Sequence, residues 1–309
     1  MQQVTPSQLT LGPLLYLWQG EAWRDFYFRI ADEAPVDHVV LGEVVCSKRA
    51  HFMAPYMQEV TERLQRAGKR VRHASLALVT LPREEKATRE LRDLDGVIEI
   101  SDLSALPALA GRPTTVGPLV NVYNAATVRF LASQGVTSIC LPPELPFDAV
   151  CEIVGSVPQM DFEIFAFGRV PLAISARCAH ARVKGNTKDN CQFVCAEDPD
   201  GLPVTTLEGQ QFLALNGVQT MSHTCQTLIA EIPDLQAHGL TGFRLSPQHC
   251  DMVAVAEIYR QILDGTLEAD QAEMALQAVY PDVPFSNGFL HADVGADFVR
   301  TPLPAAIGQ

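Results

Sequence analysis

The sequence predicts an α/β fold, a TIM-like (β/α) barrel that is either complete or incomplete and distorted, with a cysteine-bearing irregular insertion. Short apolar segments of strand length alternate with segments of helical periodicity through the first 170 residues, which is typical of parallel βαβ units. Six or seven such units in a row favour a closed or nearly closed barrel. The alternative is an open doubly wound sheet. Its dinucleotide-binding form loses support because no Gly-x-Gly-x-x-Gly follows the first strand.

Each unit carries local signals of its own. Met53, Met57, Val60 and Leu64 recur at helical spacing, and Gly68 follows where a C-terminal glycine is typical. Strands are expected at residues 11–18, 38–41, 71–78, 97–100, 114–116, 137–141 and 162–167. Helices are expected at residues 21–33, 53–64, 83–94, 103–110 and 125–134.

The alternation breaks after residue 167. Residues 169–210 are rich in Gly, Asn, Asp, Lys and Cys and poor in apolar runs. A loop this long inside a compact domain is usually functional or is ordered by something other than an apolar core, and a bound metal would supply that order. The pattern then resumes, with strands at 211–215 and 242–245 and helices at 226–236 and 252–263. We therefore expect one α/β barrel domain over residues 1–309, with a cluster-binding loop segment at 169–210.

Composition narrows the function classes. The chain has 309 residues, of which 47% are hydrophobic and 19% charged, and its formal net charge is −13. Such an acidic chain disfavours nucleic acid as a partner, since nucleic-acid binding usually needs a concentrated basic face. No apolar run approaches the ~18 residues of a membrane span, and the first residues lack the pattern of a signal peptide. We expect a cytoplasmic protein without a transmembrane segment.

Four of the eight cysteines form a candidate metal site. Cys191 and Cys195 are four residues apart and would share one face of a helical turn, and Cys178 lies thirteen residues upstream. Cys46 follows a predicted strand, and loops after barrel strands open on the same face. In a reducing compartment, clustered thiols indicate metal binding rather than disulfides. The spacing leaves structural zinc and an iron–sulfur cluster open, and slightly favours the cluster because only one pair is close.

Several segments resemble a known family. Glu-Ile-Phe-Ala-Phe-Gly at 163–168, followed by Ile-Ser-Ala-Arg-Cys at 174–178, resembles the signature of the collagenase-like peptidases of unknown catalytic type, in which Glu-x-Phe-x-x-Gly leads into a cysteine-bearing loop. Within that family the chain is most similar to the branch that serves ubiquinone biosynthesis. The further resembling segments are 41–49, 121–127, 215–222 and 244–248, in the same order.

The resemblance implies a specific chemistry. It implies a 4Fe-4S cluster held by Cys46, Cys178, Cys191 and Cys195, and a heterodimer with the similar protein UbiU. It also implies oxygen-independent hydroxylation of the ring of a ubiquinone precursor, together with UbiT, a lipid-binding accessory protein. Relatives hydroxylate RNA bases with prephenate as the apparent oxygen donor. Many members carry a cysteine just after the signature glycine, but residues 169–172 here hold none, so Cys46 would supply the missing ligand.

Candidate substrate-pocket residues follow from the expected barrel mouth. Asn121, Asn124 and Glu144 come after predicted strands, although Asn124 would equally serve as a helix cap. A donor with two carboxylates needs cations, and Arg177, next to Cys178, is a candidate unless it is a surface charge. No catalytic residue is identified. The resemblance implies a hydroxylase subunit that acts only in complex with its partner. The alternatives are a zinc-stabilised peptidase-like hydrolase and a non-catalytic scaffold with a structural cluster.

Overall fold

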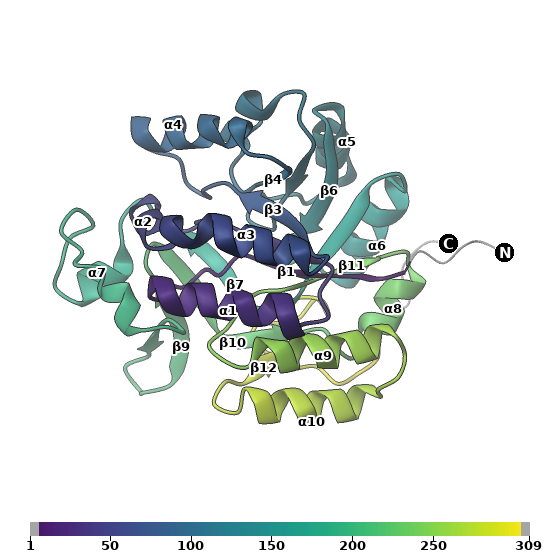
Figure 1. Cartoon of the computed structure of the whole chain (residues 1–309). Helices are drawn as coiled ribbons and strands as arrows, with labels where there is room; N and C mark the ends of the chain where they lie inside the picture. Colours follow the sequence, from purple (N-terminus) through teal and green to yellow (C-terminus); the bar gives the residue numbers. More distant parts are fainter. Residues whose placement is uncertain (1–5, 304–309) are drawn as a thin grey trace.

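Eight parallel strands close into a barrel in the computed structural model, which describes residues 6–303 (Figure 1). Each strand pairs with the next along the chain, and the last pairs with both the first and the seventh, which closes the ring. The predicted TIM-like barrel is confirmed. The barrel strands are β1 (Gln8–Leu11), β2 (His38–Leu41), β3 (Arg70–Ala74), β4 (Val97–Ile100), β5 (Thr114–Val116), β6 (Val136–Leu141), β7 (Asp161–Ile174) and β11 (Gly242–Leu245).

Helices cover the outside of the barrel (Figure 1). Their apolar faces pack on the outward side chains of the strands, as α1 does through Trp23, Tyr27 and Ile30. The α-helices are α1 (Gly20–Glu33), α2 (Ala50–Met53), α3 (Met57–Arg66), α4 (Pro82–Glu90), α5 (Ala125–Ser133), α6 (Phe147–Ser156), α7 (Ala179–Val183), α8 (Ile232–Ala237), α9 (Met252–Leu263) and α10 (Ala269–Val279). Short 3-10 helices are η1 (Ser47–Arg49), η2 (Ala54–Tyr56), η3 (Leu91–Asp93), η4 (Leu103–Ala105), η5 (Pro107–Leu109) and η6 (Val194–Glu197). Within residues 6–303, no helix is long and apolar enough to cross a membrane.

An insertion between β7 and β11 rises from the barrel rim. Strand β7 continues beyond the barrel, and its second half pairs antiparallel with β10 (Gln219–Thr227), so that Gln226 lies opposite Gly168. Strands β9 (Gln211–Asn216) and β8 (Leu202–Thr205) extend this small sheet, and β12 (Phe285–Ser286) pairs with β10. In Figure 1 the sheet and α7 project from one side of the barrel. The insertion is therefore fixed over the carboxyl ends of the strands.

The structure differs from the sequence expectations in several segments. The strand expected at 71–78 ends at Ala74, and the helix expected at 103–110 is two short 3-10 helices, η4 and η5. The first strand ends at Leu11 rather than continuing to residue 18, because Gly12 and Pro13 begin a loop. Residues 169–174 are strand rather than irregular chain, since they pair with β10. The helix expected at 226–236 begins only at Ile232, because its first residues complete β10. The last two errors share a cause, which is a pairing between segments far apart in the sequence.

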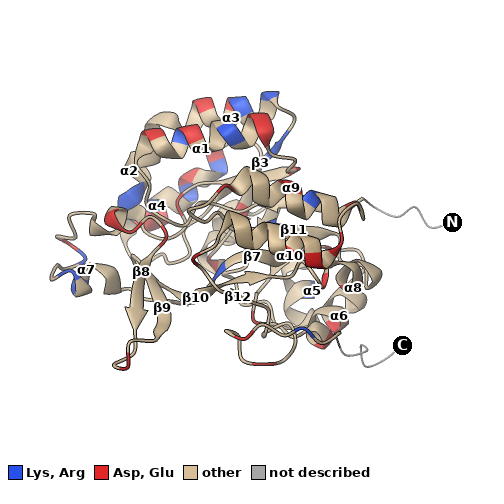
Figure 2. Ribbon diagram, turned by 90° about the horizontal axis from the view of Figure 1, so that it is seen from below, with Lys and Arg blue, Asp and Glu red and all other residues tan. Residues whose placement is uncertain are grey.

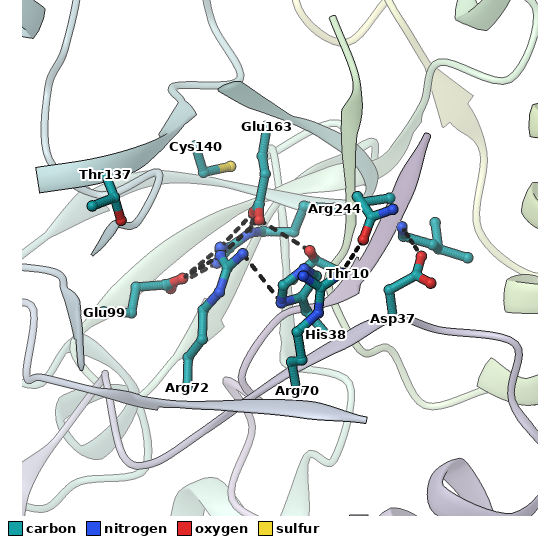
Figure 3. Close-up of polar contacts among 12 residues, drawn as sticks. Thr10, Asp37, His38, Arg70, Arg72, Glu99, Thr137, Cys140, Glu163 and Arg244 are labelled. Carbon is teal, nitrogen blue, oxygen red and sulfur yellow. Dashed lines mark hydrogen bonds and ion pairs between the residues drawn. The ribbon is translucent and has the colours of Figure 1, made fainter. Parts of the chain in front are cut away.

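Two arginines and two glutamates meet inside the barrel (Figure 3). Arg244 on β11 donates to Glu99 on β4 at 2.7 and 2.5 Å, and to Glu163 on β7 at 2.8 and 3.1 Å. Arg72 on β3 donates to Glu163 at 2.6 Å, and the Thr10 hydroxyl donates to the same carboxylate at 3.0 Å. Each charge thus has a partner on another strand, which buried charges require.

Ion pairing outweighs burial in setting the charge state of Glu163. Burial alone would raise the pKa of this carboxyl, but Arg72 and Arg244 lower it well below its ordinary value. A depressed pKa in the folded state stabilises the fold above the pKa of the unfolded chain, and this contribution is lost as the pH falls. Ion pairs in the barrel interior therefore join β3, β4, β7 and β11.

We predict that Arg244→Met lowers the free energy of unfolding by about 3–5 kcal/mol, because it leaves two buried carboxylates with one cation. Urea unfolding followed by circular dichroism measures the loss. The matched control is Arg300→Met, which breaks an exposed pair with Glu273 and should leave stability almost unchanged. Equal losses in the two variants would contradict a structural role for the interior charges.

Candidate metal centre

Four thiols line one small cavity at the barrel rim. Cys46 comes from the loop after β2, Cys178 begins α7 beyond β7, and Cys191 and Cys195 lie before and within η6. All eight cysteines are free thiols. The structure thus brings together the four cysteines that the sequence singled out. Among residues 6–303, however, no three His, Cys, Asp or Glu side chains converge as the ligands of a single metal ion do. The four thiols line this cavity from three separate segments of the chain.

The backbone between Cys191 and Cys195 differs from the expected helical turn. Gln192 and Phe193 both adopt left-handed conformations, with φ of 49° and 52°, which are uncommon for residues other than glycine. The Phe193 ring packs edge-on against Phe52, with ring centroids 5.0 Å apart. Two consecutive left-handed residues make a tight reversal, and this places both cysteines on the wall of the same cavity.

Arg49 is the buried cation of this cavity. Its guanidinium donates to the Leu15 carbonyl at 2.9 Å and to Asn216 Oδ1 at 3.0 Å, while its Nε has no partner among the described residues. Burial alone would lower the pKa of Arg49, but Glu43 and the Cys195 and Cys46 thiols raise it above its ordinary value. Arg49 thus keeps a full positive charge beside the thiols.

Burial also controls the thiols themselves. It raises the pKa of Cys46 and of Cys195, and at Cys195 the positive charge of Arg49 acts in the opposite direction. Lys48 and Lys188 line the cavity as well, and Lys48 Nζ donates to the Lys188 carbonyl at 2.6 Å. Four thiols among three cations form a donor set suited to an anionic metal–thiolate group.

His180 stabilises the loop that carries Cys178, Cys191 and Cys195. Its ring is fully buried and contacts Asp198 Oδ2 at 3.0 Å and the Leu215 carbonyl at 3.2 Å. Burial lowers the pKa of this imidazole, whereas Asp198 raises it. His180 therefore joins α7 to the end of η6 and to β9, and it does not line the cavity.

The four pocket candidates from the sequence lie elsewhere. Arg177 is exposed. Asn124 caps α5, with its Oδ1 accepting from the Thr127 backbone N–H at 2.9 Å. Asn121 is exposed, and Glu144 is half-buried and accepts from the Tyr123 hydroxyl. None of the four lines the cysteine cavity or the pocket at the centre of the mouth.

The central mouth pocket has the interior charges as its floor. Glu99 and Arg244 line it from below, and residues following several strands surround it, among them Ser101 and Ser246. Active sites of TIM barrels lie at this end. The Leu15 side chain lines the pocket, and its carbonyl accepts from Arg49. The sequence analysis did not identify Glu99. The feature that could have indicated it is a single carboxylate within an otherwise apolar strand.

Comparisons with known proteins agree on a family. The sequence model described as peptidase family U32 matches residues 26–299. The tRNA hydroxylation protein P of Escherichia coli (strain K12) is 31% identical over 108 residues, which are 31% of this chain and 24% of that protein. The protein of the same name from Haemophilus influenzae is 41% identical over 58 residues, 19% and 13% of the two chains. The matched segments thus span a quarter or less of these relatives.

Similar solved structures are distant. N-acetylneuraminate lyase from Fusobacterium nucleatum, complexed with pyruvate, has a TM-score of 0.46 and 8% identity over 86% of this chain and 77% of its own. A putative fructose-1,6-bisphosphate aldolase from Coccidioides immitis has a TM-score of 0.41 and 9% identity over 88% and 86% of the two chains. Similarity at this level indicates nothing about activity.

We predict that Gly217→Ala destabilises the protein and displaces Arg49. A Cβ at Gly217, where φ is 62°, would lie 2.5 Å from Arg49 Nη2. The control is Gly185→Ala, which has φ of 79° and nothing within 4 Å of the added Cβ. The free energy of unfolding should fall by about 1–3 kcal/mol more at Gly217, which is the usual cost of overpacking. Equal losses would mean that the contact with Arg49 relaxes freely.

Proposed function

Because the chain belongs to the U32 peptidase family, and its curated relatives are named for tRNA hydroxylation, we propose that it is the iron–sulfur subunit of a hydroxylase. The observation that carries the proposal is the cavity lined by Cys46, Cys178, Cys191 and Cys195. Thiolates hold iron–sulfur clusters, and three cations line the same cavity, as an anionic group requires.

The arrangement of the thiols favours a cluster over zinc. One zinc ion needs four ligands about 2–2.3 Å from a single centre. A 4Fe-4S cluster binds each thiolate at a different iron, so it suits four cysteines that come from three separate segments and of which only one pair is close in sequence. When bound, such a cluster supplies one-electron transfer. The four cysteines would hold it, and Arg49 would offset part of its negative charge.

We further propose that this is a UbiV-like subunit. The family signature glycine is Gly168, and residues 169–172, which follow it, hold no cysteine, unlike the same stretch of many relatives. Arg169 lies in β7 and donates to Asp200 at 3.2 Å and to the Ser222 carbonyl at 3.2 Å. That position is filled by a structural ion pair, which supports Cys46 as the fourth ligand. A UbiU-like protein would complete the heterodimer, and a UbiT-like lipid-binding protein would deliver the substrate.

The proposed reaction is oxygen-independent hydroxylation of the ring of a ubiquinone precursor, with prephenate as a candidate oxygen donor. Converting a ring C–H to C–OH with oxygen from a hydroxyl group removes two electrons from the ring. The reaction therefore needs a two-electron acceptor, such as an oxidised quinone or dye. The charge supports a ring rather than tRNA as the substrate. The net charge is −13, and on the face seen in Figure 2 the basic residues alternate with acidic ones along α1 and α3. A nucleic-acid binder needs a concentrated basic face.

We predict that the chain purified under argon is brown and contains about four irons, as four-cysteine ligation requires. Replacing any one of the four cavity cysteines by serine should remove most of the iron. Cys151→Ser is the control, because this half-buried thiol does not line the cavity and its loss should leave iron unchanged. One zinc per chain and no iron would support the peptidase-like hydrolase instead, and absence of both metals would end the proposal.

A second experiment tests the proposed hydroxylation and its substrate. The chain, purified with a UbiU-like partner, is given a phenolic ubiquinone precursor with UbiT-like protein, or unmodified tRNA. Each mixture contains prephenate and an oxidised dye as the two-electron acceptor, and no dioxygen. We expect mass spectrometry to show one added oxygen on the ring compound only, and only when both subunits are present. Hydroxylated tRNA with an unchanged ring compound would contradict the substrate. Full activity in an iron-free Cys178→Ser variant would show that the cluster is a scaffold.

A further inference from the structure

An apolar pocket outside the cysteine cavity lies between the barrel wall and the helices α2, α3 and α4. Its volume is about 350 Å³, within the range of small-molecule sites. It lies at the carboxyl ends of β2 and β3, on the outer side of the barrel. The large apolar side chains that line it are Leu41, Met53, Met57, Leu76, Leu91 and Leu94.

The pocket exists because α4 does not fill the space over the strands. The buried side chains of α4 are Glu84 and Thr88, neither of which is large and apolar. Glu84 accepts from the Ser47 hydroxyl at 2.6 Å and from the Leu81 backbone N–H at 3.1 Å. This carboxylate fixes the start of α4 to the loop after β2. The walls on both sides of the pocket are therefore held in place without a ligand.

His73 is the polar group that the pocket leaves available. Its neighbour Arg72 points into the barrel, so His73 points outward into the pocket. Burial lowers the pKa of His73, with no contribution from a hydrogen bond or a charge. The imidazole is therefore neutral and carries one donor and one acceptor.

The other polar side chains of the pocket are already engaged. Ser75 Oγ accepts from the Ser101 backbone N–H at 2.9 Å, and Thr88 donates to the Glu84 carbonyl at 2.9 Å. Glu43 accepts from the backbone N–H of Cys46 at 2.8 Å. No lysine or arginine lines the pocket, so an anionic ligand would find no cation here.

We propose that this pocket binds an uncharged, largely apolar molecule that carries one hydroxyl or carbonyl group, and that His73 recognises that group by a hydrogen bond. Ser47 lines the pocket and the adjacent Cys46 lines the cysteine cavity, so the bound molecule lies beside the thiol-bearing loop. The proposal deepens the proposed function, since a phenolic ring precursor belongs to this ligand class. Its test measures binding alone, so either proposal can fail without the other.

The probes are 4-butylphenol and butylbenzene, which differ by one hydroxyl, titrated calorimetrically into the full chain. The wild type should bind both and prefer the phenol. His73→Phe keeps the ring volume and removes the hydrogen bond, so affinity for the phenol should fall about three- to tenfold, as loss of one hydrogen bond implies. Affinity for butylbenzene should stay the same. An unchanged preference for the phenol would overturn the role of His73.

Two substitutions on opposite walls fill the pocket, Ala54→Trp and Ala87→Trp. At least one should abolish binding of both probes. The control is Lys86→Trp, which places the same side chain at an exposed position of α4 and should bind as the wild type does. The pocket is not the site if the wild type binds neither probe, or if both filled variants bind normally.

Discussion

The paired charges at the centre of the barrel constrain everything built on its rim. The ion pairs join two arginines to two glutamates, and each of the four residues lies on a different strand. A shift of one strand in register would therefore leave a buried charge without its partner. The same groups form the floor of the mouth pocket. The interior is therefore rigid where a typical apolar barrel core would tolerate substitution, and the loops above it start from fixed positions.

Arg49 has an equivalent role one layer higher. Its guanidinium joins the loop after β1, through the Leu15 carbonyl, to the insertion, through Asn216. Gly217 is required beside it because any side chain would occupy the space of Nη2. The cysteine cavity and the insertion thus share one buried cation, which also bonds the backbone of Leu15, a residue that lines the central pocket.

Much of this architecture could be predicted from local sequence. The predicted bounds of β2, β4, β5, β11 and α9 agree with the structure, because apolar periodicity and turn residues define these elements without reference to distant segments. The convergence of Cys46 with Cys178 followed from their places after two barrel strands. The pairing of β7 with β10 could not be predicted, since nothing near Gly168 indicates Gln226. The interior charges escaped prediction because Arg72 and Glu99, considered alone, are typical of solvent-facing strand positions.

The four cavity cysteines come from two parts of the fold, and this determines how the fold would respond to loss of a bound group. Cys178, Cys191 and Cys195 belong to the insertion, whereas Cys46 belongs to the barrel itself. A group held by all four would add one more connection between the two parts, beside the β7–β10 pairing and the Arg49 hydrogen bonds, so its loss would leave the insertion attached. The barrel would remain folded on its own ion pairs. The same polypeptide could then take up such a group again without refolding.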